Sequence, residues 1–423
     1  MKANYDCITI GGGASGMIAG ITAARNGQKV LLLEKKEKLG KKILLTGNGR
    51  CNISNRHSEE DKRQAKHYFG ENPKFVLSVF NRFGYEETRE FFDKLGVEFV
   101  EEDSGRMFPA SNQAQAVVDV LEYELKSLNV KIVFNVDGMG VDFDKEKKKF
   151  EVKISDGRVF ETSKLLVATG GKTHKQTGST GDGYKLAEQF GHNILPQFPV
   201  YSGLNVTKES EAKHFPLMHK LQGTKLEAEV VAKIDGKEIA KNTGTIMFAH
   251  YGLSAPGVLE ISREISKEFF LNDKKAEVSL NFFPGKNKQE VEELLQKTWK
   301  NNPNRTLGFS LVGLLPKKVF PAILEVEGID HEQKVAEVNK EIRAKIAELL
   351  TNLTFQIDSV RGFQEAHFTA GGVDTKEVNP STLESKLQPG LYFCGEVLDI
   401  DGECGGYNLQ WAWSSGAVAG SIT

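Results

Sequence analysis

The sequence contains few cysteines, and none of them stands at the spacing of a metal site or a redox pair. Its four cysteines, Cys7, Cys51, Cys394 and Cys404, are scattered over 423 residues without a C-x-x-C motif. This distribution argues against a disulfide framework, structural zinc and dithiol redox chemistry. The nine histidines form no H-E-x-x-H or comparable cluster either, so we expect no bound metal. Any redox chemistry would therefore depend on an organic cofactor.

Long hydrophobic runs and an excess of charge of one sign are also missing. No segment approaches the roughly 18 uninterrupted apolar residues of a membrane span, and the first residues lack the apolar core of a signal peptide. We therefore expect a cytoplasmic protein with no membrane partner. The formal net charge of -2 lacks the basic excess of a dedicated nucleic-acid binder and argues against nucleic acid as a partner. The sequence leaves the oligomeric state open.

The N-terminal segment has the pattern of a βαβ unit. Residues 5–10 are typical of a buried strand, residues 14–26 of a helix and residues 29–33 of a second strand. Gly11, Gly13 and Gly16 form a G-x-G-x-x-G motif before the helix, where glycine permits a tight turn and close approach of the backbone to a pyrophosphate. Glu34 follows the second strand, where a carboxylate can accept hydrogen bonds from ribose hydroxyls. These residues predict a dinucleotide site, and they would suit FAD or a nicotinamide dinucleotide equally.

The remaining sequence predicts an α/β fold interrupted by an insertion. Helical periodicity covers residues 73–95 and 112–128, and a strand follows at 130–136. An antiparallel meander then extends to residue 160, and a separate buried strand begins at Leu165 and leads into ATGG. We predict a discontinuous nucleotide-binding Rossmann domain of residues 1–193 and 362–423. Residues 194–361 form the predicted inserted domain, which is β-rich over 194–285 and helical over 286–352, with one helical face containing Val335, Val338, Ile342, Ile346 and Leu349.

Four long motifs resemble one known family. They are KLGKKILLTGNGRCNISN at residues 38–55, GRMFP at 105–109, GSTGDGY at 178–184, and the tail from Thr369 with CGEVLDIDGECGGYNLQWAWSSG. Over nearly the whole chain, the sequence resembles the BaiN-like NAD(P)/FAD-dependent oxidoreductases, bacterial flavoproteins that include proteins called aminoacetone oxidase. The resemblance implies a glutathione-reductase-like FAD fold with an inserted β-domain and a helical portion. FAD is therefore the expected cofactor, and NAD(P)H is a candidate transient electron donor that would bind without a second G-x-G-x-x-G motif.

The resemblance and the motifs together assign the cofactor contacts. In the glutathione-reductase-like FAD fold, ATGG passes near the ADP portion and a terminal G-E motif holds the ribitol chain. The family places the loop that contains Gly47, Gly49, Arg50, Cys51 and Asn52 against the flavin. A helix beginning near Asn408 could aim N–H groups at the flavin N1 and C2 carbonyl, where negative charge accumulates on reduction. Arg50 would suit the pyrophosphate or a reduced flavin. Lys41 and Lys42 could reach phosphate oxygens or, equally, lie on a solvated basic face. The expected cofactor-binding residues are Gly11, Gly13, Ala14, Ser15, Gly16, Glu34, Lys35, Lys41, Lys42, Thr46, Gly47, Gly49, Arg50, Cys51, Asn52, Val136, Thr169, Gly170, Gly171, Gly395, Glu396, Gly406, Tyr407, Asn408 and Leu409.

The sequence fixes the reaction type less firmly than the cofactor. Tyr407, His250 and His367 are candidate catalytic residues, and no motif singles out one of them. Our first hypothesis is an oxidoreductase whose FAD accepts hydride from NAD(P)H at N5 and reduces a small unsaturated organic substrate. The alternatives are an FAD-dependent oxidase of a small amine such as aminoacetone that uses dioxygen, an FAD-dependent RNA-modifying enzyme, and a flavin-binding protein without turnover.

Overall fold

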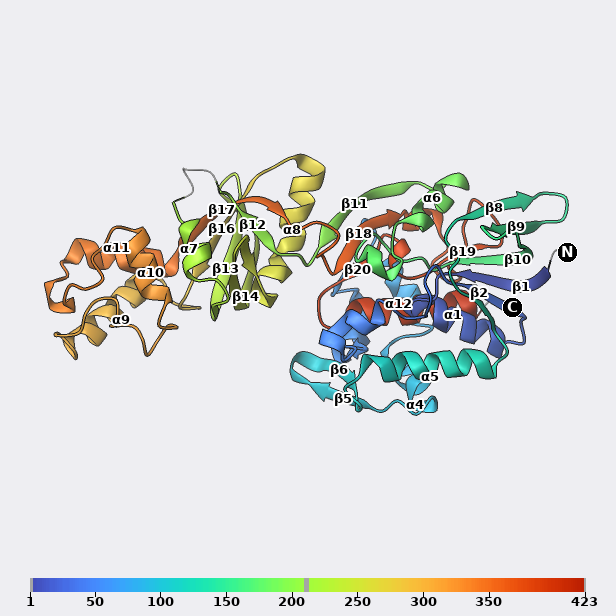
Figure 1. The fold of residues 1–423 in the computed structure, drawn as a ribbon, viewed down its shortest axis with the longest axis horizontal. Helices are drawn as coiled ribbons and strands as arrows, with labels where there is room; N and C mark the ends of the chain where they lie inside the picture. Colours follow the sequence, from blue (N-terminus) through green and yellow to red (C-terminus); the bar gives the residue numbers. More distant parts are fainter. Residues whose placement is uncertain (1–2, 209–212, 422–423) are drawn as a thin grey trace. The chain divides into compact units, whose positions relative to one another are not determined.

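The computed structural model describes residues 3–208 and 213–421, and the chain divides into two compact units (Figure 1). Unit 1 contains the described residues up to Gln197 and from Phe368 onward, and unit 2 spans Phe198–His367. The chain leaves unit 1 through β11 (Ile194–Val200) and returns through β18 (Phe368–Val373), and these two strands pair with each other. Each unit has a hydrophobic core of its own.

A mixed sheet forms the centre of unit 1. Its strands follow the order β7-β2-β1-β10-β9-β8, with β19 paired to β10. β1 (Ala3–Ile10) and β2 (Val30–Leu33) run parallel, and α1 (Ala14–Arg25) connects them, so the βαβ unit expected from the sequence is confirmed. All four residues of β2 are buried, as is typical of a parallel strand covered on both faces.

β10 (Val159–Val167) is one continuous strand, although the sequence pattern suggested two. Its first residues pair antiparallel with β9 (Lys149–Ile154), and its last residues pair in parallel with β19 (Leu391–Phe393). β1 runs parallel along the other edge of β10 throughout. The expected meander is completed by β8 (Met139–Asp144). Because β10 and β1 end at the same edge of the sheet, ATGG emerges directly beside the glycine-rich turn.

The other elements of unit 1 surround this sheet. The single helix expected at residues 73–95 is instead two helices, because the chain is extended at Gly84, whose N–H donates to Glu87 Oε2 at 2.8 Å in a capping box for the second helix. The elements of unit 1 outside the central sheet are β3 (Ser54–Asn55), α2 (Asp61–Gln64), β4 (Tyr68–Phe69), α3 (Phe75–Phe80), α4 (Tyr85–Lys94), β5 (Phe99–Glu102), β6 (Arg106–Pro109), α5 (Ala114–Ser127), α6 (Asp182–Gln189) and β20 (Asp401–Gly402), and the edge strand β7 of the sheet spans Lys131–Val133.

The C-terminal helix α12 (Tyr407–Gly420) packs directly against α1 (Figure 1). A Cβ atom at Gly416 would lie 2.3 Å from the Ser15 carbonyl oxygen, and one at Gly420 would lie 2.4 Å from that of Ala19. Only glycine permits this backbone contact. Trp411 and Trp413 are buried in the core of unit 1. The packing therefore brings the C-terminal tail next to the N-terminal glycine motif.

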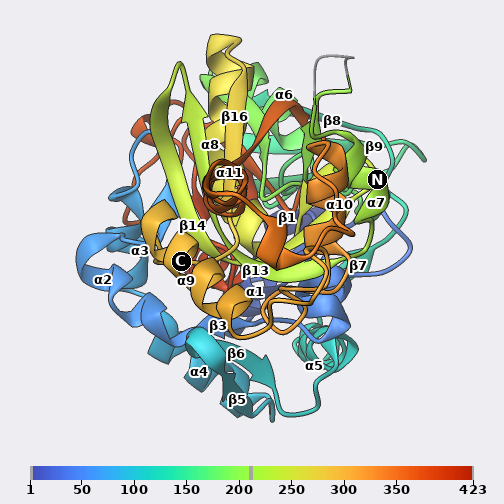
Figure 2. The ribbon, with the colours of Figure 1, turned by 90° about the vertical axis from the view of Figure 1, so that its left-hand side faces the viewer.

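Unit 2 combines a closed β-barrel with helices. The barrel order is β12-β15-β14-β13-β16-β17, formed by β12 (Leu204–Val206), β13 (Lys225–Ile234), β14 (Lys237–Ala249), β15 (Gly252–Ser254), β16 (Ala276–Asn281) and β17 (Leu353–Val360). The helices are α7 (Pro216–Lys220), α8 (Pro256–Asn272), α9 (Lys288–Lys300), α10 (Val319–Val326) and α11 (Lys340–Thr351). Within this unit, α9, α10 and α11 lie together at one end (Figures 1 and 2).

The prediction that Val335, Val338, Ile342, Ile346 and Leu349 share one helical face is wrong for the first two residues. Val335 lies in a short 3₁₀ turn that ends before Val338, and α11 begins only at Lys340. The Asn339 side chain accepts a hydrogen bond from the Ile342 N–H at 2.8 Å and so fixes this start. Val335 and Val338 are nevertheless buried in the core of unit 2, which explains why their apolar spacing suggested a helix.

Candidate FAD site

The glycine-rich turn between β1 and α1 leaves open space in front of a helix N-terminus. A Cβ atom at Gly16 would lie 1.8 Å from the Gly11 carbonyl oxygen, and Gly11 itself has φ +104°. Gly13 is the N-cap of α1, no described side chain caps the helix there, and a Cβ atom at Gly13 would meet nothing within 4 Å. The N–H groups of the first turn and the positive end of the helix dipole suit a pyrophosphate at this position.

Glu34 is fixed behind this turn by two backbone hydrogen bonds. Its Oε2 accepts from the Gly12 N–H and its Oε1 from the Lys36 N–H, both at 2.7 Å. The residue is 8% exposed, and burial raises the pKa of its carboxyl group. The Val136 N–H donates to the Glu34 carbonyl oxygen, which holds the end of β2 in place. The Lys35 amine is instead bonded to Thr180 and Asp182 at the start of α6.

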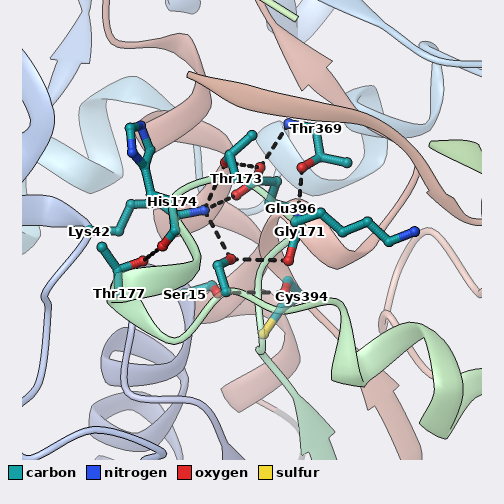
Figure 3. Close-up of polar contacts among 11 residues, drawn as sticks. Ser15, Lys42, Gly171, Thr173, His174, Thr177, Thr369, Cys394 and Glu396 are labelled. Atoms are coloured by element: carbon teal, nitrogen blue, oxygen red, sulfur yellow. Dashed lines mark hydrogen bonds and ion pairs between the residues drawn. The ribbon is translucent and has the colours of Figure 1, made fainter. Parts of the chain in front are cut away.

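A polar cluster joins ATGG to the C-terminal G-E motif (Figure 3). Lys42 Nζ lies 2.9 Å from Glu396 Oε2, 3.0 Å from Ser179 Oγ and 3.2 Å from Thr173 Oγ1. Glu396 Oε1 accepts a hydrogen bond from the Thr369 N–H at 2.9 Å. Burial alone would raise the pKa of Glu396, but the Lys42 ammonium and the bond from Thr369 outweigh it and lower that pKa. A Cβ atom at Gly171 would lie 2.7 Å from Thr369 Cβ and 2.8 Å from Glu396 Oε1, so ATGG packs closely against both residues.

Gly395 lies against the first turn of α1. It has φ +78°, and a Cβ atom there would lie 2.5 Å from Ser15 Oγ. The Gly395 N–H donates to Ser415 Oγ at 2.9 Å, and Trp411 Nε1 donates to the Gly395 carbonyl oxygen at 3.2 Å. The structure thus collects Ser15, Lys42, Gly171, Gly395 and Glu396, which the sequence assigned separately, into one region of unit 1.

The loop at residues 43–52 and the residues beside it make several contacts with other protein groups. Arg50 lies 2.6 Å from Glu102 and stacks over Phe108 at 4.1 Å, so its guanidinium is already engaged by protein groups. Lys41 pairs with Glu37 at 2.9 Å. Thr46 Oγ1 donates to the Ile43 carbonyl oxygen at 2.7 Å, Gly47 and Gly49 have positive φ angles, and burial raises the pKa of the Cys51 thiol to about 12. A thiol with so high a pKa argues against a redox role for Cys51.

The start of α12 presents a second helix N-terminus without a side-chain cap. Gly406, the N-cap, has φ +107°, and a Cβ atom there would lie 2.3 Å from the Ser54 carbonyl oxygen and 3.0 Å from Asn52 Oδ1. Asn52 Oδ1 is buried and has no hydrogen-bond partner among the described residues. Asn408 Oδ1 accepts from the Gly402 N–H at 2.9 Å and so orders the preceding loop, while Leu409 packs against the core.

These features together fit FAD. The N-termini of α1 and α12 have no side-chain cap, and the positive end of a helix dipole stabilises negative charge. A pyrophosphate carries such charge permanently, and the pyrimidine end of a flavin gains it on reduction. Two buried polar atoms without partners among the described residues, Asn52 Oδ1 and Thr169 Oγ1, belong to segments that the sequence assigned to the cofactor. The described residues contain no group of three or more His, Cys, Asp or Glu side chains that could hold a metal ion.

Two of the three catalytic candidates belong to unit 2. His250 and His367 are both exposed residues of unit 2, whereas every cofactor candidate belongs to unit 1. Tyr407 belongs to unit 1 but is only 4% exposed, and its carbonyl oxygen accepts a hydrogen bond from the Tyr68 hydroxyl at 2.9 Å.

Sequence reasoning missed a histidine–carboxylate pair beside Tyr407. The His67 ring stacks on the Tyr407 ring, with 4.5 Å between ring centroids and 21° between ring planes. His67 Nδ1 lies 3.0 Å from Asp61 Oδ2, and Asp61 is fully buried. The segment from Asp61 to His67 has no periodicity and matches no motif, so nothing in the sequence pattern marked these two residues as partners.

Comparisons with known proteins identify the family of this chain. The HI0933-like protein Rossmann domain matches residues 5–422. The 3-dehydro-bile acid delta(4,6)-reductase of Clostridium scindens is 40% identical over 418 residues, which cover 97% of each chain. The ribosomal RNA dihydrouridine synthase of Escherichia coli is 33% identical over 414 residues, covering 97% of this chain and 96% of that protein.

A solved structure of 3-ketosteroid delta1-dehydrogenase from Sterolibacterium denitrificans shares the fold, with a TM-score of 0.52, 13% identity and 99% coverage of both chains. In residues 3–208 and 213–421 no helix has both the length and the apolar character needed to cross a membrane. The family resemblance and the α/β Rossmann fold expected from the sequence are confirmed. The chain belongs to the HI0933-like family of FAD-dependent oxidoreductases.

Proposed function

We propose that this protein uses NAD(P)H and FAD to reduce a carbon–carbon double bond conjugated to a carbonyl group. The observation that carries the proposal is its likeness, over 97% of its length, to two enzymes named for different substrates. A 3-dehydro bile acid with delta-4,6 unsaturation contains a dienone. Dihydrouridine is uridine with a saturated C5–C6 bond, and in uridine that bond is conjugated to the C4 carbonyl. The two names therefore share one type of reduced bond, although the substrates differ greatly in size.

The described residues support a flavin-dependent reaction of this type. Bound FAD would supply the hydride chemistry, and the protein would supply binding, orientation and electrostatics. The α1 N-terminus around Gly13 would hold the pyrophosphate, and Glu396, kept ionised by Lys42, would accept hydrogen bonds from hydroxyls of the ribitol chain. The uncapped α12 N-terminus after Gly406 would stabilise negative charge at the pyrimidine end of the flavin.

A small dienone or enone is the first candidate substrate, and uridine in RNA is the second. One observation favours the second: residues 294–324 of unit 2 contain five cationic side chains and no Asp or Glu. Lys297, Lys300, Arg305, Lys317 and Lys318 are all exposed. Such a stretch suits a phosphate backbone, although the chain as a whole has no basic excess. Oxidation of a small amine remains a hypothesis from the sequence alone.

The test compares these substrates on the same protein. Protein containing FAD is mixed anaerobically with NADPH or NADH and then with a 3-oxo-4,6-dienoic bile acid or with an unmodified ribosomal RNA transcript. The proposal predicts a product that has gained two hydrogen atoms, detected by mass spectrometry. Reduction of the transcript alone would select RNA, and its binding should then weaken when Lys317 and Lys318 are changed to Glu. Turnover of neither substrate, with peroxide released from aminoacetone in air, would contradict the proposal.

A further inference from the structure

The His67–Asp61 pair has the geometry of an oriented acid. Asp61 accepts two hydrogen bonds from the same residue, one from the His67 backbone N–H at 3.0 Å and one from the ring Nδ1 at 3.0 Å. A carboxylate that holds Nδ1–H fixes both the ring orientation and the tautomer of a histidine. Nε2 is then the nitrogen that can gain or release a proton.

The ring is mostly buried and lies beside the start of α12. Its side chain keeps 10% of its exposure, and Nε2 has no hydrogen-bond partner among the described residues. The stacking on Tyr407 places the ring beside the first residue of α12, whose N-terminus is the candidate contact for the flavin pyrimidine end. In addition, the Glu403 N–H donates to the His67 carbonyl oxygen at 3.0 Å and ties His67 to the loop that precedes α12.

The charged groups around His67 favour its protonated form. Burial alone would lower the pKa of His67, but the hydrogen bond and the charge of Asp61, with a smaller contribution from Glu403, outweigh it and raise that pKa. Lys66 opposes this change. Tyr68 on β4, another titratable neighbour, is neutral at physiological pH, because burial raises its pKa well above the ordinary value of 10.

We propose that His67, oriented by Asp61, is the catalytic acid that protonates the substrate carbon next to the one that receives the hydride. The inference rests on the proposed function. Bound FAD that NAD(P)H has reduced would supply a hydride to one carbon of the conjugated double bond and would itself be reoxidised, and the proton on His67 Nε2 adds to the neighbouring carbon. The π bond breaks, two C–H bonds form, and His67 becomes neutral while its Nδ1–H stays bonded to Asp61. Solvent then returns the proton to Nε2.

Two variants and a matched control test this role in protein loaded with FAD, with a 3-oxo-4,6-dienoic bile acid as the probe. His67→Gln should retain flavin and its reduction by NAD(P)H, yet reduce the probe about 100- to 10,000-fold more slowly, the usual contribution of a general acid. The wild-type rate should fall as the pH rises through the raised pKa of His67, and His67→Gln should lose this dependence. His57→Gln, at a second histidine of unit 1 whose N–H donates to Asn55 Oδ1 at 3.0 Å, should behave as wild type. A His67→Gln rate within about twofold of the wild-type rate, with the same pH profile, would overturn the proposal.

A second measurement separates this inference from the proposed function. NMR titration of His67 in the loaded wild-type protein should give a pKa above the ordinary 6.5, and Asp61→Asn should lower it. A pKa at or below 6.5, or one that Asp61→Asn leaves in place, would overturn the inference even if the enzyme reduces the probe. If the wild-type protein reduces neither the bile acid nor an RNA transcript, the proposed function fails, and His67 as an acid for that reaction fails with it. If His67 nevertheless shows a pKa above 6.5 that Asp61→Asn lowers, the geometry of the pair is correct and the assumed substrate is wrong.

Discussion

Replacement of Gly13 by alanine separates cofactor binding from folding. Gly13 has φ -81°, a conformation that alanine adopts without strain, and a Cβ atom there would contact no described atom within 4 Å. The free energy of unfolding of the protein without FAD should therefore change by no more than about 0.5 kcal/mol. The added methyl group would instead project into the space that we assign to the pyrophosphate.

The expected loss of FAD affinity follows from this steric overlap. An extra methyl group in a tightly packed contact typically costs about 1–3 kcal/mol, which corresponds to an affinity about 5- to 150-fold weaker. Gly16→Ala should behave differently, because its Cβ atom would lie 1.8 Å from the Gly11 carbonyl oxygen and must disturb the fold of unit 1 itself.

The assay measures FAD binding and thermal unfolding on the same apoprotein preparations. Flavin fluorescence quenching gives the dissociation constant, and calorimetry of the protein without FAD gives its stability. Gly140→Ala on β8 is the matched control, because its Cβ atom also meets nothing within 4 Å and β8 carries no candidate site residue. If Gly13→Ala and Gly140→Ala bind FAD equally well, the pyrophosphate does not lie in front of α1.

Two further variants test other parts of the structure. Glu34→Ala should lose FAD and also loosen the turn, because it leaves the Gly12 N–H without its 2.7 Å acceptor, whereas Cys404→Ser should retain the flavin content of wild type. In unit 2, burial would raise the pKa of Glu327, but the bonds from Lys213, Lys345 and His214 outweigh it and lower that pKa to about 2. Glu327→Gln should therefore destabilise unit 2 by roughly 1–3 kcal/mol at pH 7. Because the native pKa is depressed, the stability contributed by this carboxylate is present above the ordinary value of 4.5 and is lost as the pH falls towards 2, and the variant should lack this dependence in thermal unfolding.

Much of the fold was predictable because its signals are local. The glycine spacing at Gly11, Gly13 and Gly16 and the buried run of β2 define the βαβ unit within about thirty residues. The alternating pattern of β8 and β9 likewise predicts their antiparallel pairing. The barrel of unit 2 was beyond this reasoning, because closure joins β12 to β17 across most of the unit and no short pattern encodes it.

In the candidate site, too, contacts between residues far apart in the sequence could not be predicted from local patterns. Lys42 and Glu396 were both predicted to contact the cofactor, yet their ion pair links residues 354 positions apart and could not be read from either motif. Arg50 was assigned to the flavin by its loop, but Glu102 and Phe108 engage it through the packing of β5 and β6. His67 could not be recognised because its significance comes only from Asp61 and Tyr407, which the fold brings together. The cofactor contacts themselves stay a prediction.

The most direct test of the account is the visible spectrum of the FAD-loaded protein under anaerobic conditions. Addition of NADPH or NADH should bleach the flavin absorption, and subsequent addition of a 3-oxo-4,6-dienoic bile acid or uridine-containing RNA should restore it as the double bond is reduced. A flavin that both nucleotides leave oxidised, but that aminoacetone bleaches, would contradict the reductase proposal and favour an amine oxidase.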